Sequence, residues 1–468
     1  MTVSMATRLV SVLGLGFGDC GKGLFVDALC RQLDAHTVVR FNGGAQAAHN
    51  VVLPDGRHHT FSQFGAGSFN RGVYTLLAYP VIVHPTALLV EHDYLRRAGV
   101  EDGLDRLIID ARCRLTTPFH QAAGRMRELA RADGRHGSCG VGVGETVRLD
   151  IARPELTLRY GDLTHRAHAP AKLEAIRRDL LAAFAPLCPV AANDAEYQRE
   201  RAVLNDAMMA RHWLDRSMEL VRIVPPARRA DVARRLQMPG AVVFEGAQGI
   251  LLDEWRGFHP HTTWSTIHPS SVQAVAADAG LHAKIHHLGA LRSYLTRHGD
   301  GPLPTHDTRL TSLPEPHNAS GGWQGAFRRA HPDAVLLRYA LSVAGRLDGL
   351  AISHLDVFGR APGLRWCNAY AAPVGDGDGQ LCERDADGRI TELRASAGHD
   401  LAHQAALTKL LHAATPVLDA EPVADAGQFI EQMERLTRLP VVLAAFGPTF
   451  EAVKALRPLW GSEENRRK

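Results

Sequence analysis

The residues near the start of the chain that are best suited to chemistry lie in one glycine-rich run, from Gly16 to Gly23. Glycines let the backbone curl so that N–H groups point at an anion, and Lys22 adds a mobile positive charge. The spacing G-x-x-x-x-G-K is that of a phosphate-binding loop. We predict that a nucleoside triphosphate is bound here by Gly18, Gly21, Lys22 and Gly23. The alternative is a glycine-rich turn without chemistry.

Two residues of this run depart from an ordinary P-loop. Gly23 stands where a Ser or Thr hydroxyl would hold magnesium, which disfavours a common ATPase or kinase. Asp19 places a carboxylate beside the expected phosphates, which costs electrostatic repulsion unless that carboxylate holds a metal or takes a proton. The alternative for Asp19 is a cap on the helix that begins near Gly21.

The elements that must position this loop follow a strand, helix, strand pattern. The apolar run 9–14 predicts a strand, 21–33 a helix and 37–41 a second strand, the opening of a parallel α/β sheet. Further strands are predicted at 74–83, 106–109, 241–245, 350–355 and 439–446. Helices are predicted at 171–184, 195–220 and 227–236. We therefore expect a P-loop-NTPase-like α/β fold in which helices flank a large, mostly parallel central sheet, with a helical insertion at about 168–238 in a single domain spanning 1–468.

Composition excludes several classes of protein. Lys and Arg number 53 and Asp and Glu 50, and the resulting net charge of +3 is too small to recruit nucleic acid or an anionic membrane by itself. The seven cysteines form no C-x-x-C pair, which indicates a reducing compartment. The apolar run 9–15 is broken by Gly16, Gly18 and Asp19, so neither a signal peptide nor a membrane span is predicted, and we expect a cytoplasmic protein.

Three ordered motifs together resemble the adenylosuccinate synthetase family. They are the runs 14–23, 38–49 and 244–253. Further likeness at 158–163, 294–305, 355–357 and 446–448 extends the resemblance over nearly the whole chain.

The resemblance implies a reaction in two steps: GTP phosphorylates the 6-oxygen of a purine nucleotide, and the amino group of aspartate then displaces the phosphate. By motif, Asp19 resembles the base that removes the ring N1 proton and also binds Mg²⁺, and His49 the acid that polarises the 6-oxygen. Lys22 would steady the transferring phosphoryl group. The carbonyl of Ala48 would lie near the metal.

The purine-nucleotide site implied by the resemblance comprises Gln46, Ser138, Cys139, Arg153, Gln248 and Thr263. Gln46 replaces an asparagine of the family, and Ser138 and Cys139 replace two phosphate-binding threonines. Arg153 matches an arginine that reaches the partner subunit's nucleotide, which implies a homodimer. The alternative for Arg153 is a solvated loop charge.

The triphosphate-base site implied by the resemblance consists of His354, Asp356, Gly447 and Pro448. Asp356 can accept hydrogen bonds from guanine, whereas His354 replaces a lysine whose stem would stack on the base. GTP is therefore expected, with ATP as the alternative.

The amine-donor loop, 320–329, is the largest departure. Arg328 and Arg329 align with two arginines of the family, but Ala326 replaces another and Trp323-Gln324 replace two threonines. A dicarboxylate is best held by bidentate guanidinium groups, so we expect weak use of aspartate or a different donor.

Three interpretations of function remain open. The first is a ligase of purine nucleotide and amine, either the parent reaction or that of a divergent paralogue with another amine donor or purine. The second is a catalytically inactive nucleotide-binding regulator, which the joint presence of Asp19, Lys22 and His49 argues against. The third is an unrelated P-loop phosphotransferase, which Gly23 disfavours.

Overall fold

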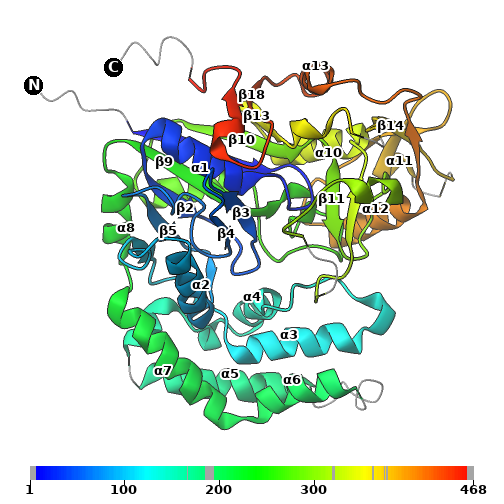
Figure 1. Cartoon of the computed structure of the whole chain (residues 1–468). Helices are drawn as coiled ribbons and strands as arrows, with labels where there is room; N and C mark the ends of the chain where they lie inside the picture. The colour runs from blue at the N-terminus through cyan, green and yellow to red at the C-terminus, as the bar shows by residue number, and fades with distance from the viewer. Residues whose placement is uncertain are drawn as a thin grey trace, which may run out of the picture.

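The computed structural model describes residues 7–165, 167–184, 194–318, 322–360, 363–373, 375 and 378–460. Its centre is a nine-stranded sheet in the order β19-β18-β13-β10-β1-β9-β2-β5-β7, parallel except for β19 (Figure 1). The strands are β1 (Arg8–Gly14), β2 (Ala35–Arg40), β5 (Tyr74–Leu77), β7 (Leu107–Ile109), β9 (Ala241–Gly249), β10 (Ile285–Arg292), β13 (Gly349–Ser353), β18 (Val441–Ala445) and β19 (Val453–Ala455). The predicted α/β class is confirmed.

Strand β1 is central and is buried on both of its faces. Successive side chains of a strand point to opposite faces, so Val10 and Val12 join one apolar cluster while Leu9 and Leu13 join the other. Helices α1 (Lys22–Leu33), α2 (Pro85–Arg97) and α3 (Pro118–Ala130) contribute to the first cluster. Helices α9 (Pro269–Asp278), α10 (Ala334–Ala344), α12 (Leu401–Ala413) and α13 (Ala426–Thr437) contribute to the second. Parallel strands covered on both faces explain the continuous apolar runs of the sequence.

Strand β10 was not predicted, although it pairs with β1 along its length. Its sequence includes His286 and His287, and both side chains are buried. His287 Nδ1 lies 2.7 Å from Ser11 Oγ, which gives this ring a polar partner inside the sheet. The predicted strand 74–83 is two strands, β5 and the short β6 (Ile82–Val83), because a turn intervenes.

The helical insertion forms a lobe below the sheet in Figure 1. The lobe contains α5 (His168–Phe184), α6 (Ala195–Asn205) and α7 (Ala207–Ile223), which contact α3, and α3 in turn contacts α4 (Val143–Ala152). Helix α8 (Arg229–Leu236) lies beside the sheet in Figure 1, and its Val232 and Leu236 join the second apolar cluster. The lobe's buried residues Leu173, Trp213 and Leu220 belong to the same apolar cluster as Val10. Among the described residues, no helix is both long enough and apolar enough to cross a bilayer.

Smaller sheets complete the fold. The hairpin β3 (His49–Val52) and β4 (His58–Phe61) covers the start of α1, and β11 (Leu295–His298) pairs with β12 (Phe327–Ala330). β6 pairs with β8 (Arg114–Leu115). β14 (Cys367–Ala371), β15 (Cys382–Arg384), β16 (Ile390–Leu393) and β17 (Thr415–Leu418) form a four-stranded sheet near α10 and the short α11 (Asp378–Leu381).

Asp333 is the N-cap residue of α10. Its carboxylate accepts from the N–H groups of Val335 and Leu336, both at 3.0 Å, and from the Tyr370 hydroxyl at 2.6 Å. Burial raises the pKa of Asp333 to about 6. The folded chain therefore binds this proton more tightly than the unfolded chain, so the contribution of the group to stability is complete below about pH 4 and is lost as the pH rises through about 6.

We expect Asp333→Asn to abolish the loss of folding stability that accompanies ionisation of Asp333 as the pH rises, because asparagine caps a helix without ionising. Urea unfolding at pH 4.5 and at pH 7 gives the change in unfolding free energy between these two pH values. We expect this change to differ between variant and wild type by at most about 3 kcal/mol. Asp400→Asn, at the exposed cap of α12, is the matched control. An unchanged pH dependence in Asp333→Asn would contradict the assignment.

Candidate active site

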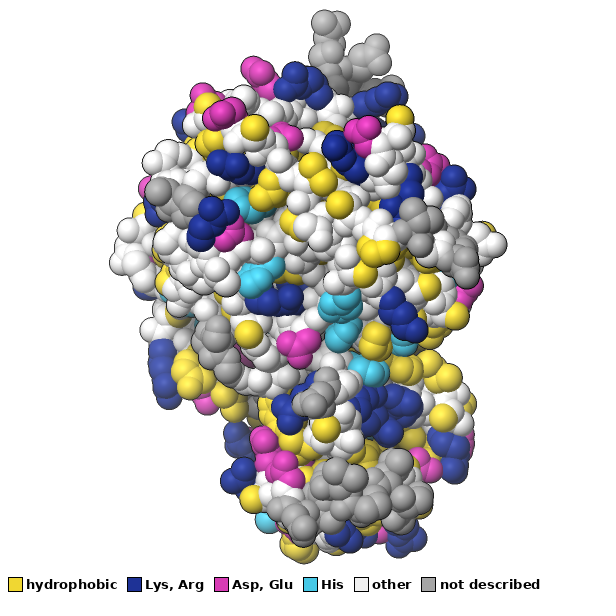
Figure 2. All heavy atoms as spheres, turned by 90° about the vertical axis from the view of Figure 1, so that its right-hand side faces the viewer, with side chains coloured by type: hydrophobic (Ala, Val, Ile, Leu, Met, Phe, Trp, Pro, Cys, Tyr) yellow, Lys and Arg dark blue, Asp and Glu magenta, His cyan; other side chains and the backbone are white. Residues whose placement is uncertain are grey.

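A cavity of about 500 Å³ lies among the phosphate loop, the loop before α4 and the end of β9. Figure 2 shows several histidine side chains across the middle of one face of the molecule. The predicted residues that line the cavity are Gly18, Asp19, Gln46, Ala48, His49, Ser138, Cys139, Gln248 and Thr263. The fold thus brings together residues from segments that are distant in sequence.

The phosphate loop has the expected left-handed glycines, with φ of 127° at Gly18 and 75° at Gly21. Helix α1 begins within this run, at Lys22. The Lys22 side chain is buried, and its Nζ donates to the carbonyl of Gly18 at 2.5 Å. Burial lowers the pKa of Lys22.

The structure explains why a glycine, and not the Ser or Thr of an ordinary P-loop, stands at position 23. A Cβ at this position would lie 2.8 Å from the carbonyl oxygen of Asn50 and 3.1 Å from the Cβ of His49. A Ser or Thr of an ordinary P-loop would therefore collide with strand β3. The missing hydroxyl is the result of a close approach that brings His49 beside the phosphate loop.

Asp19 does not cap α1, so the helix-cap alternative is wrong. The cap residue is Gly21, and no side-chain cap hydrogen bond is formed at this helix start among the described residues. The Asp19 carboxylate lines the cavity, and its Oδ2 lies 3.9 Å from Nε2 of His298. The carboxylate is therefore available to a ligand.

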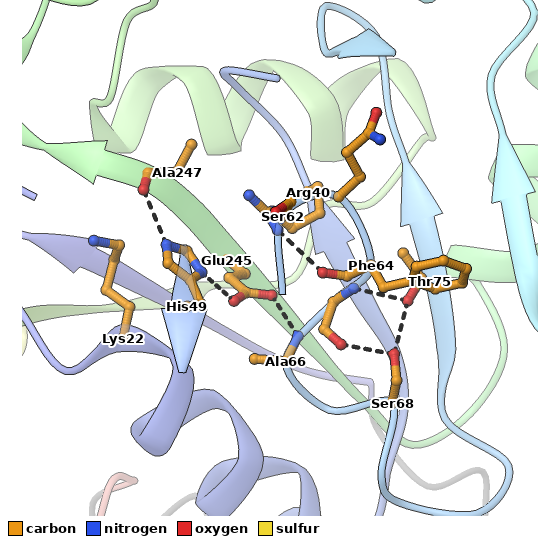
Figure 3. Close-up of polar contacts among 12 residues, drawn as sticks. Lys22, Arg40, His49, Ser62, Phe64, Ala66, Ser68, Thr75, Glu245 and Ala247 are labelled. Atoms are coloured by element: carbon orange, nitrogen blue, oxygen red, sulfur yellow. Dashed lines mark hydrogen bonds and ion pairs between the residues drawn. The ribbon is translucent and has the colours of Figure 1, made fainter. Parts of the chain in front are cut away.

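His49 is held by a buried carboxylate that the sequence analysis did not assign. Nδ1 of His49 lies 2.5 Å from Glu245 Oε1, and Nε2 lies 2.9 Å from the carbonyl oxygen of Ala247. Glu245 Oε2 accepts from the N–H of Ala66 at 2.9 Å. Figure 3 shows His49 between Lys22 and Glu245. A glutamate that directly follows the apolar residues 241–244 of strand β9 was the signal available in the sequence.

The two contacts of His49 define its chemistry. Both ring nitrogens face oxygen acceptors, and only the doubly protonated ring can donate to both. Burial would raise the pKa of Glu245, but Arg40 and His49 outweigh it and hold that pKa below its usual value. Burial lowers the pKa of His49 although Glu245 opposes the effect, so its imidazolium gives up a proton readily. This arrangement suits an acid that polarises an oxygen.

The predicted purine-nucleotide residues differ in the hydrogen bonds that their side chains make within the protein. The Gln248 amide donates to the carbonyl of Ser265 at 2.7 Å and accepts from Asn42 at 3.0 Å. Both polar side-chain atoms of Gln46 are buried and have no hydrogen-bond partner among the described residues. Burial raises the pKa of Cys139 to about 11, so its thiol is neutral.

The predicted triphosphate-base residues lie beside the loop, outside the main cavity. His354 and Asp356 follow β13, whose Ser353 hydroxyl oxygen would be 2.6 Å from a Cβ on Gly21. Asp356 pairs with Arg360 at 3.4 Å, and burial lowers the pKa of His354 to about 3. Gly447 and Pro448 follow β18, which pairs with β13, so all four residues lie at the same edge of the sheet.

The predicted amine-donor arginines do not line the cavity. Arg328 donates to the carbonyl of Gly301 at 2.5 Å, and Arg329 lies 5.2 Å from the ring centre of Phe327. Residues 319–321 of this loop lie outside the described residues, and Gln324 contributes to the cavity wall. Arg297, which was not predicted, lines the cavity and donates to the carbonyls of Pro302 at 2.8 Å and His261 at 3.1 Å.

Arg153 lies at the end of α4 and is half-exposed. It pairs with Glu155 at 2.7 Å and with Asp179 at 3.0 Å in its own chain. It does not line the cavity of its own chain, so its predicted contact with a partner's nucleotide stays a prediction.

The parallel sheet, the phosphate loop and the cavity define an α/β enzyme of the nucleotide-handling class. The sequence profile of adenylosuccinate synthetase matches residues 11–453. The chain therefore belongs to the adenylosuccinate synthetase family, the ligases of purine biosynthesis, which confirms the resemblance.

Individual relatives agree with this family assignment. The chain is 31% identical over 459 residues to adenylosuccinate synthetase from Ectopseudomonas mendocina, covering 96% of this chain and 98% of the relative. It is 30% identical over 450 residues to that from Pseudomonas aeruginosa PAO1, covering 94% and 96%.

Two solved structures share the fold. Fully ligated adenylosuccinate synthetase from Plasmodium falciparum gives a TM-score of 0.73 at 20% identity, covering 96% of this chain and 100% of that one. Succinoaminodeoxyadenylate synthetase of cyanophage S-2L, bound to dGMP and dATP as an energy donor, gives 0.57 at 16% identity, covering 99% and 100%.

We expect Asp19→Asn and His49→Asn each to lower kcat by roughly 10²-fold or more, because each removes a proton-transfer or charge-stabilising group. Nucleotide affinity should change less. Steady-state kinetics and nucleotide titration measure the two effects separately. Asp55→Asn, on the exposed turn of the β3–β4 hairpin, is the control. Turnover within about threefold of wild type would remove the substituted residue from the mechanism.

Proposed function

We propose that the protein is a triphosphate-dependent ligase that phosphorylates the 6-oxygen of an IMP-like purine nucleotide and replaces it with an amine. The observation that carries the proposal is the convergence of Asp19 and the His49–Glu245 pair on one cavity beside the phosphate loop. A carbonyl oxygen is a poor leaving group and phosphate is a good one. Phosphorylation therefore has to precede the attack of the amine.

The residues take their roles from their surroundings. Asp19, a carboxylate on the cavity wall, accepts the ring N1 proton and so makes the 6-oxygen nucleophilic. His49, placed by Glu245, donates to that oxygen. Lys22 lies beside His49 (Figure 3) and offsets the negative charge that develops on the transferring phosphoryl group. The amine then attacks C6, and phosphate leaves.

Magnesium fits the oxygen donors of this site. Mg²⁺ in nucleotide sites is held by one or two carboxylates together with the substrate phosphates, and it retains several waters. Asp19, which caps no helix, and the carbonyl of Ala48 would hold the ion. When bound, it neutralises phosphate charge. The described residues contain no cluster of three or more His, Cys, Asp or Glu that could form an all-protein site.

GTP is the proposed phosphate donor, with ATP as the alternative. The Asp356 carboxylate can accept from the N1 and 2-amino groups of guanine, which adenine lacks. Its neighbour Arg360, at 3.4 Å, competes for the same oxygens. The preference for GTP should therefore be small.

The proposed location and assembly are those of a cytoplasmic homodimer. Six free cysteines among the described residues suit a reducing compartment: Cys20, Cys30, Cys113, Cys139, Cys367 and Cys382. The homodimer rests on the match of Arg153 to an arginine that reaches a partner's site. Neither nucleic acid nor membrane is a proposed partner.

The reaction is tested with purified protein, Mg²⁺, GTP or ATP, a purine nucleotide (IMP or dGMP) and a panel of amines. We expect nucleoside diphosphate and a 6-substituted product, formed together and only when all three substrates are present. GTP should give the higher kcat/KM. Equal values for GTP and ATP would make Asp356 structural only. Nucleotide binding without any product would favour the inactive regulator.

Aspartate should be a weak donor, because the sequence has no Lys or Arg between Arg309 and Arg328 and Arg328 already donates to a backbone carbonyl. A charge-assisted contact contributes roughly 1.5–3 kcal/mol, so the loss of one should raise the aspartate KM about ten- to a hundredfold relative to an intact clamp. L-Asparagine, which has nearly the same shape as aspartate but one carboxylate fewer, is the amine donor for comparison. Saturation at low micromolar aspartate would contradict this reading.

A further inference from the structure

Arg148 is an arginine of the cavity wall to which the sequence analysis gave no role. It lies in the middle of α4, and its guanidinium carbon is 5.2 Å from the ring centre of Trp264. Trp264 also lines the cavity and packs against Ile82, Val143 and Val147. An arginine stacked on a supported indole is restrained before any ligand arrives.

The guanidinium of Arg148 has hydrogen-bond donors that the protein leaves unsatisfied. Its Nε is buried and has no hydrogen-bond partner among the described residues. The nearest carboxylate oxygen, Oε1 of Glu145, is 3.5 Å from that Nε. Glu145 already accepts two hydrogen bonds from Arg127, at 2.7 and 3.2 Å. Arg148 therefore keeps donors available for an anion.

The other arginines of the cavity wall are committed to protein acceptors. Arg127 binds Glu145 with two hydrogen bonds, and Arg131 forms an ion pair with Glu128. Arg297 bonds two carbonyls. Within the described part of the chain, Arg148 is thus the cavity arginine with the least satisfied donors.

The loop before α4 does not supply the missing anion contacts by itself. The N–H groups of His136, Gly137 and Ser138 all donate to Glu128 Oε2, at 3.0, 3.1 and 3.4 Å. A loop that already holds a carboxylate has fewer N–H groups left for a phosphate. The start of α4 remains open, because its cap residue Gly142 provides no side-chain acceptor.

We propose that Arg148 binds the 5′-phosphate of the purine nucleotide within its own chain, together with the start of α4 and Thr263. The inference rests on the proposed function, because the bound anion is the phosphate of that substrate. A planar guanidinium suits a phosphate, which accepts two parallel hydrogen bonds from it. Arg148 would contact the phosphate from within the chain that binds the nucleotide.

The experiment is a calorimetric titration of wild type, Arg148→Gln, Arg148→Lys and Arg153→Gln with IMP, dGMP, inosine and GTP. Arg148→Gln should weaken IMP binding about ten- to a hundredfold, because a charge-assisted contact to phosphate is lost. Inosine, which lacks the phosphate, and GTP should bind all variants as they bind wild type. Arg148→Lys should lose less affinity than Arg148→Gln, because lysine retains the positive charge. It should still lose some, because lysine lacks the planar guanidinium that makes two parallel hydrogen bonds. Arg178→Gln, an exposed arginine of α5, is the neutral control.

The outcomes separate this inference from the function on which it rests. If wild type binds IMP and Arg148→Gln binds it equally well, Arg148 is structural and the inference fails while the proposed function stands. If Arg153→Gln alone loses IMP affinity, the phosphate is held by the partner subunit and the inference also fails. If wild type binds neither IMP nor dGMP, both proposals fail. Arg148→Lys keeps the test valid if the glutamine variant does not fold.

Discussion

The buried pair of His49 and Glu245 is the interaction on which the site depends. It joins strand β3 to strand β9, and the second oxygen of Glu245 fixes the backbone at Ala66. A carboxylate that is fully buried must have its charge balanced, and Arg40, Lys22 and His49 surround it. Removal of one member would leave the others as unpaired buried charges, which is costly. The pair therefore fixes the orientation of the histidine ring as well as its proton affinity.

The sequence predicted the parts of the molecule that are encoded locally. The phosphate loop was predicted because its glycines, lysine and flanking apolar strand are contiguous. Most central strands were predicted because both faces of a parallel sheet are covered, which produces apolar runs. Strand β10 was missed because His286 and His287 interrupt such a run, and their burial depends on partners such as Ser11 far away in the chain.

The site was harder to predict, for reasons of geometry. The two alternatives for Asp19 were separated only by the observed cap of α1, which a sequence pattern does not determine. Glu245 and Arg148 were not assigned because a single charged residue in a strand or helix is as compatible with a surface position. Their environments come from segments that are distant in sequence: β3 for Glu245, and Trp264 for Arg148.

The contact at Gly23 has a consequence for how the two substrates would influence each other. The N-terminal turn of α1 and the backbone of His49 and Asn50 touch without an intervening side chain, so a displacement of one must be shared by the other. The same turn carries Lys22, which bonds the loop at Gly18. Ligands on the two sides of this contact would be coupled energetically. Any such linkage is reciprocal: the factor by which the bound triphosphate changes the affinity for the purine nucleotide equals the factor by which the bound purine nucleotide changes the affinity for the triphosphate.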